Sequence, residues 1–145
     1  MPDKSIDLKI DRLKAVKSAY ILEAGASMAR GLDAVGMGLL LKAAEMELQL
    51  AELFRSQKDD ERNAQVSLLS AGSCFLGARQ YRTALVLLAQ VVDRFPDARG
   101  LIAQCEGKED APVAAVTPGL QALIELLVKK KVIDEREWAD AFAAR

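Results

Sequence analysis

The sequence contains no histidine and only two cysteines, Cys74 and Cys105. Histidine is the commonest general base near neutral pH and the commonest zinc ligand, so its absence removes two usual starting points for catalysis and metal binding. The two cysteines are too far apart for a Cys-x-x-Cys redox pair, and two ligands cannot complete a tetrahedral zinc site. We expect reduced and buried thiols, no enzymatic activity, and no metal or cofactor.

Proline is absent between Pro2 and Pro96, and aromatic residues are few: one Trp, two Tyr and four Phe. A long stretch without proline allows helices to run without interruption. Apolar residues make up 51% of the chain, and most of them are Ala, Leu and Val, whose compact side chains suit close helix packing. We predict an all-α fold, built as an antiparallel array of helical hairpins.

The chain also lacks an excess of either charge and lacks a long apolar run. Its 20 basic and 21 acidic residues give a net charge of −1, without the basic stripe of a nucleic-acid-binding protein. The most apolar stretch, residues 34–44, contains Lys42 and is shorter than the roughly 20 residues that span a bilayer. The N-terminus has no apolar core of a secretion signal. We expect a cytoplasmic protein that neither binds nucleic acid nor inserts into membranes.

The spacing of apolar residues predicts five helices in the first two thirds of the chain. We place them at residues 5–30, 39–57, 60–78, 81–95 and 98–105. The first has apolar residues three or four positions apart on one face: Ile6, Ile10, Leu13, Val16, Tyr20 and Ala24. The second has a similar stripe: Leu41, Ala44, Leu48, Ala51 and Phe54. Both helices are therefore expected to bury one side.

The remaining third is predicted to be a separate helical hairpin behind a linker. Residues 107–116 combine Gly, Pro, small residues and mixed charge, as linkers do. Thr117 and Pro118 are typical of a helix start, and Asp134 with Glu137 has the spacing of a capping box. We divide the chain into a helical domain at 1–106, a linker at 107–116 and a hairpin at 117–145.

Residues 65–98 resemble one tetratricopeptide repeat, a helix–turn–helix unit of 34 residues. The matching residues are Ala71, Gly72, Phe75, Tyr81, Ala84, Leu88, Val91 and Pro96. Small residues at Gly72 and Ala84 would let the two helices approach closely where they cross. A shift of one repeat upstream would place a turn at Glu45 and Met46, within a strong helical run, so a longer helix is expected there. Downstream, Glu106 takes the glycine position and the pattern ends.

The resemblance implies a groove lined by the first helix of the unit, with Val66, Leu69, Ser73 and Leu76 at the binding positions. None of these is a Lys, Arg or Asn that could clamp a peptide carboxylate, so an apolar helix is the expected occupant. The favoured occupant is the chain's own first helix, through Ile10, Leu13 and Val16. The alternative is an amphipathic helix of a partner protein.

Residues 120–142 resemble the short C-terminal helical hairpins of many bacterial proteins, although Lys131 and Asp134 replace the usual Gly and Thr. The resemblance implies oligomerisation or docking, and the expected contact residues are Leu123, Leu127, Trp138 and Phe142. A hairpin of this size cannot bury its apolar side alone. It is expected to pack on its own body or on a second subunit.

These observations favour a protein–protein interaction module, that is, an adaptor, chaperone or assembly factor that binds a partner helix or segment through an apolar groove. The partner would be another protein, and a homo-oligomer is possible. The alternative is a self-assembling structural protein that uses the terminal hairpin as its contact. A small-ligand binder or enzyme is the third hypothesis, disfavoured by the absence of histidine and of a phosphate-binding loop.

Overall fold

A computed structural model describes residues 4–57 and 60–112 of the 145-residue chain. These residues form α-helices and no strands, which confirms the predicted all-α class. The helices are α1 (Lys4–Ala29), α2 (Asp33–Ser56), α3 (Glu61–Gly77), α4 (Tyr81–Val91) and α5 (Ala98–Cys105). Their bounds lie close to the predicted ranges, except at the start of α2 and the end of α4.

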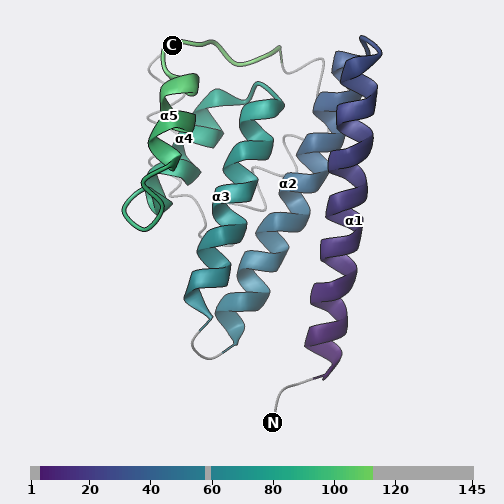
Figure 1. Cartoon of the computed structure of the whole chain (residues 1–145), viewed down its shortest axis with the longest axis vertical. Helices are drawn as coiled ribbons and strands as arrows, with labels where there is room; N and C mark the ends of the chain where they lie inside the picture. Colours follow the sequence, from purple (N-terminus) through teal and green to yellow (C-terminus); the bar gives the residue numbers. More distant parts are fainter. Residues whose placement is uncertain (1–3, 58–59, 113–145) are drawn as a thin grey trace.

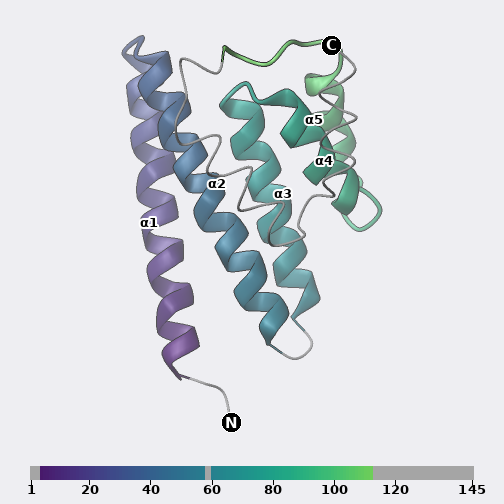
Figure 2. The ribbon, with the colours of Figure 1, turned by 180° about the vertical axis from the view of Figure 1, so that it is seen from behind.

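Each described helix packs against the next one along the chain, and α5 also contacts α3. The long helices α1, α2 and α3 lie side by side and are joined at alternate ends (Figure 1). Seen from behind, α1 again lies at one edge and α5 at the other (Figure 2). The order of packing leaves one side of α1 without a neighbouring helix among the described residues.

Helix α2 begins at Asp33, before the predicted start, because two glycines there do not break it. The tight turn from α1 requires only Gly31, whose φ of +80° is a left-handed conformation that glycine adopts without strain. Gly36 instead serves packing, because a Cβ at this position would overlap the Met28 side chain of α1. As expected, α2 then runs unbroken past Glu45 and Met46.

Helix α4 ends at Val91, earlier than the predicted Phe95. The amides of Arg94 and Phe95 both donate to the Val91 carbonyl, at 3.2 and 2.9 Å, and close the helix with a turn. Pro96 disfavours helical backbone in the residue before it, so the helix is expected to stop ahead of Phe95. Pro96 therefore keeps Phe95 out of the helix, and the turn after Val91 separates α4 from Phe95.

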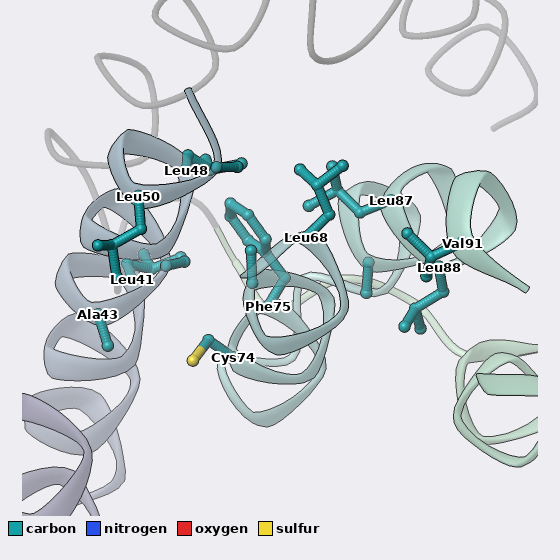
Figure 3. Packing of buried hydrophobic residues seen from close by; sticks show 14 of the residues in the cluster. Leu41, Ala43, Leu48, Leu50, Leu68, Cys74, Phe75, Leu87, Leu88 and Val91 are labelled. Carbon is teal, nitrogen blue, oxygen red and sulfur yellow. The ribbon is translucent and has the colours of Figure 1, made fainter. Parts of the chain in front are cut away.

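The core lies between α2, α3 and α4, and Phe75 extends from α3 into its middle (Figure 3). Gly72 lies where α3 meets α4, and a Cβ there would lie 2.8 Å from Cδ2 of Leu88. The expected close approach at Gly72 is therefore present. The predicted stripe of α2 is buried throughout: Leu41, Ala44, Leu48, Ala51 and Phe54. In the stripe of α1, Ile10, Leu13 and Ala24 are buried, whereas Ile6 and Tyr20 are half-buried and Val16 is 41% exposed.

Candidate functional site

The four predicted groove residues lie on one outward side of α3, which we call the α3 face: Val66, Leu69, Ser73 and Leu76. They are three or four residues apart, so one side of the helix carries them all. Val66 is 40% exposed and Ser73 is also exposed. Leu69 and Leu76 are half-buried and pack against the edge of the core. The α3 face is thus an apolar surface that remains partly open to solvent.

The expected occupant of this face, the chain's own first helix, is not there. Helix α1 packs on α2 instead, and Ile10 and Leu13 are buried in that arrangement. Val16, the third expected contact, is exposed to solvent. The prediction that α1 fills the α3 face was therefore wrong. The physical reason is the tight turn between Ala29 and Asp33, which folds α1 back along α2, where Ile10 and Leu13 are buried and Lys17 meets Glu47.

That contact is an ion pair inside the α1–α2–α3 interface. The Lys17 ammonium of α1 lies 2.6 Å from Oε1 of Glu47, whose side chain is only 2% exposed. Ser67 of α3 is buried beside the same carboxylate, and its hydroxyl lowers the pKa of Glu47. A buried carboxylate needs such partners, because an unpaired buried charge is strongly unfavourable. The cluster of Lys17, Glu47 and Ser67 therefore brings polar groups from three helices together in this interface.

Burial controls the protonation of this cluster. Desolvation raises the pKa of the Glu47 carboxyl above its ordinary value of 4.5, although the hydrogen bond and charge of Lys17, the Ser67 hydroxyl and the charge of Lys14 oppose the shift. Burial, together with the nearby Glu47 charge, also raises the pKa of the Cys74 thiol to about 12. Figure 3 shows the Cys74 sulfur directed toward α2. Cys74 is thus a protonated thiol at neutral pH, unlike the thiolate of a nucleophilic cysteine.

Sequence reasoning missed Glu47, although a signal was present. Apolar residues surround it at helical spacing on both sides: Ala43, Ala44, Leu48, Leu50 and Ala51. A single carboxylate within such a set falls on the buried side of a helix. Glu45 and Glu52 lie on the other side of α2, where Glu45 is half-buried and Glu52 exposed, so Glu47 is the carboxylate that this pattern singles out.

The polar surroundings of the α3 face determine which ligands it suits. The Ser73 hydroxyl donates to the Leu69 carbonyl at 3.2 Å, so Ser73 is engaged by its own helix. At the start of α3, the Arg55 guanidinium of α2 donates two hydrogen bonds to the Glu61 carboxylate, at 3.2 and 3.3 Å. Arg62 is exposed one turn before Val66. The face therefore offers apolar contacts with one neighbouring basic side chain.

The first part of the predicted linker packs on the turn between α3 and α4. The Ala111 amide donates to the Arg79 carbonyl at 3.0 Å, and the Arg82 amide donates to Oδ1 of Asp110 at 3.2 Å. Since Arg82 is in the first turn of α4, the Asp110 carboxylate caps that helix. Residues 107–112 are therefore attached to the helical body rather than free of it.

The predicted contact residues of the terminal hairpin, Leu123, Leu127, Trp138 and Phe142, lie outside the described residues. Within residues 4–57 and 60–112, no three His, Cys, Asp or Glu side chains gather as a metal site would require. No helix in this described part combines the length and apolarity that crossing a bilayer demands. Comparison with known proteins finds no matching family model, no similar curated protein and no similar solved structure.

Proposed function

We propose that this chain is a protein-interaction module that binds the apolar side of a partner's amphipathic helix on the α3 face. The supporting observation is that Val66 stays 40% exposed beside the half-buried Leu69 and Leu76. Helix α1, which could have covered them, packs elsewhere. Apolar side chains at helical spacing on a rigid helix are the arrangement that helix-binding grooves use.

The resemblance of residues 65–98 to a tetratricopeptide repeat supports the same proposal. In that comparison α3 is the first helix of the unit and α4 is the second. The close approach of Gly72 to Leu88 is compatible with such a pair, as is the complete burial of Phe75 and Ala84. We propose that α3 and α4 form a tetratricopeptide-like hairpin whose outward residues contact the partner.

The chemistry of the face defines the partner segment. Two or three apolar side chains at positions i, i+3 or i+4, and i+7 would cover Val66, Leu69 and Leu76. An acidic residue at one end of that segment would lie near Arg62, which is exposed at the start of the face. The proposed activity is binding, as in an adaptor, chaperone or assembly factor, and involves no covalent chemistry.

Site-specific photo-cross-linking in cells tests this proposal. A photoreactive benzoylphenylalanine replaces Val66, and the same residue replaces Val35 as the matched control. Val35 is also an exposed valine on a helix, 52% exposed on α2. We expect the Val66 derivative to cross-link one protein through an apolar segment with helical spacing, and the Val35 derivative not to cross-link it. Equal cross-linking of the same protein from both positions would contradict the proposal.

A further inference from the structure

Helix α1 is apolar on two opposite sides, and only one of them is covered. Its inner side carries Ile10, Leu13 and Ala24, all of which are buried. On the outer side, Leu8 is 61% exposed and Leu22 is 77% exposed. Two views place α1 at the edge of the helix array (Figures 1 and 2). Two leucines this exposed on the edge helix leave a face without a partner among the described residues.

The outer residues follow the heptad spacing of a coiled coil. We call this set the α1 stripe: Leu8, Ala15, Ala19, Leu22, Ala26 and Ala29. Leu8, Ala15, Leu22 and Ala29 are seven residues apart, and Ala19 and Ala26 each follow one of them by four. This is the a/d pattern that keeps one seam toward another helix. Alanine at most of these positions would allow the backbones of two helices to approach closely.

We propose that the α1 stripe binds the α1 stripe of a second copy of this chain, with the two helices antiparallel. The charge distribution along α1 supports the antiparallel direction, and the self-complementary register described below supports a second copy as the occupant. Residues 4–17 carry five basic and two acidic side chains, a net charge of +3, whereas residues 18–29 carry only Glu23. A parallel pair would place the two basic halves together. An antiparallel pair places each basic half beside the Glu23 of the other copy and opposes the helix dipoles.

One antiparallel register overlaps the two helices along their length. It pairs Ser5 with Ala29 of the second copy, Leu8 with Ala26, Arg12 with Leu22, and Ala15 with Ala19. Each leucine then faces a smaller residue or the aliphatic stem of an arginine, which fills the seam without a clash. Lys9 lies within one helical turn of Glu23 of the second copy. The 26-residue helix provides a contact about 39 Å long.

Light scattering on the full-length protein tests the contact. Wild type is expected to be a dimer and Leu22→Glu a monomer, with the dissociation constant raised at least about a hundredfold, because two buried leucines are lost per dimer. Val35→Glu, at an exposed position of α2, is the matched control and should remain a dimer. Circular dichroism verifies that Leu22→Glu folds, as its exposure predicts. A monomeric wild type would overturn the proposal. So would a Leu22→Glu dimer, because the contact would then lie elsewhere.

Disulfide trapping tests the direction of the helices. Because Cys74 and Cys105 are buried, an added surface cysteine is the reactive one. A mixture of Ser5→Cys and Ala29→Cys proteins should form a mixed disulfide under oxidation, whereas neither protein alone should form one. Rapid dimerisation of Ser5→Cys alone would indicate a parallel pair and overturn the antiparallel assignment. Charge exchange provides a second readout: Lys9→Glu should weaken the dimer, and adding Glu23→Lys should restore it.

This inference is independent of partner binding on the α3 face. Leu22→Glu should abolish the dimer and leave cross-linking from position 66 unchanged, whereas Val66→Glu should remain a dimer and lose binding of the cross-linked partner protein. A variant that removes both properties would show that the two surfaces are one contact, which would overturn the assignment of separate roles.

Discussion

The Lys17 ammonium lies 2.6 Å from a Glu47 carboxylate oxygen, and this contact joins the edge helix α1 to the buried side of α2. The two partners differ in exposure, because the side chain of Lys17 is 24% exposed and that of Glu47 only 2%. Lys17 can therefore return to water when the pair is broken, whereas Glu47 cannot. The consequences of removing each partner should differ accordingly.

Replacing Lys17 with methionine should destabilise the protein by about 3 kcal/mol at pH 7, because the buried Glu47 charge loses its main partner. The loss should be smaller at pH 5 than at pH 7, because burial raises the pKa of Glu47 and a lower pH favours the protonated carboxyl, which does not need a charged partner. Urea unfolding monitored by circular dichroism measures both values. Lys4→Met, an exposed position on the same helix outside the proposed dimer pairs, is the control, with an expected change within about 0.5 kcal/mol. Equal losses in the two variants would contradict a stabilising role of the ion pair.

Glu47→Gln should flatten the dependence of stability on pH. The folded protein raises the pKa of the Glu47 carboxyl above its ordinary value of 4.5. Between pH 4.5 and the raised pKa, the folded state therefore binds the proton more tightly than the unfolded state. The contribution of Glu47 to the free energy of unfolding of wild type is therefore greatest below pH 4.5, and it falls as the pH rises through the elevated pKa. Glutamine has no charge to desolvate, so Glu47→Gln should be at least as stable as wild type at pH 7.

Unfolding free energies of wild type and Glu47→Gln, measured between pH 4.5 and pH 8, test this expectation. The control for losing a carboxylate from α2 is Glu52→Gln, at an exposed position of the same helix. A wild-type advantage over Glu47→Gln that grows with pH would contradict the sign of the expected change.

Gly72→Ala should destabilise the protein by about 1–3 kcal/mol, because the new methyl group would lie 2.8 Å from Cδ2 of the fully buried Leu88. Alanine favours helix over glycine by up to about 1 kcal/mol, but this gain is smaller than the cost of overpacking. Gly38→Ala is the matched control on α2, because a Cβ there meets no atom within 4 Å. Thermal unfolding should rank Gly38→Ala above wild type and Gly72→Ala below it; the reverse order would exclude close packing at Gly72.

Asp110→Ala should cost about 1 kcal/mol, because the carboxylate accepts the Arg82 amide and caps α4. Asp110→Asn should retain most of the stability, since an amide oxygen can accept the same bond. Amide hydrogen exchange provides a local readout, in which Arg82 should lose protection in Asp110→Ala. Unchanged exchange at Arg82 would show that the cap does not contribute.

The sequence predicts the helices well because their signals are local. Helical spacing predicts α1, α3 and α5 close to their true bounds, and the close approach of two helices expected at Gly72 is present. The start of α2 was missed because Gly36 reads as a helix breaker unless its contact with Met28 is known. Only the packed structure shows which neighbour a glycine accommodates.

The assignment of surfaces was harder to predict, because it depends on which helices meet. Periodicity identified Val66, Leu69 and Leu76 as one side of α3, yet it could not exclude α1 as their cover. The tight turn after Ala29 folds α1 back onto α2, where Lys17 meets Glu47, and this packing leaves the α3 face uncovered by α1. In the same way, Leu8 and Leu22 belonged to no predicted stripe, and their exposure appears only once the inner side of α1 is fixed.

The central claim, that the α3 face binds a partner helix, is tested most directly by calorimetry. The partner segment cross-linked from position 66 is synthesised as a peptide and titrated into wild type, Val66→Glu and Val35→Glu. We predict that the peptide binds wild type and Val35→Glu equally, and that Val66→Glu binds at least about tenfold more weakly, because a charge replaces an apolar contact. Equal affinity of all three proteins, or no binding to wild type, would contradict the claim.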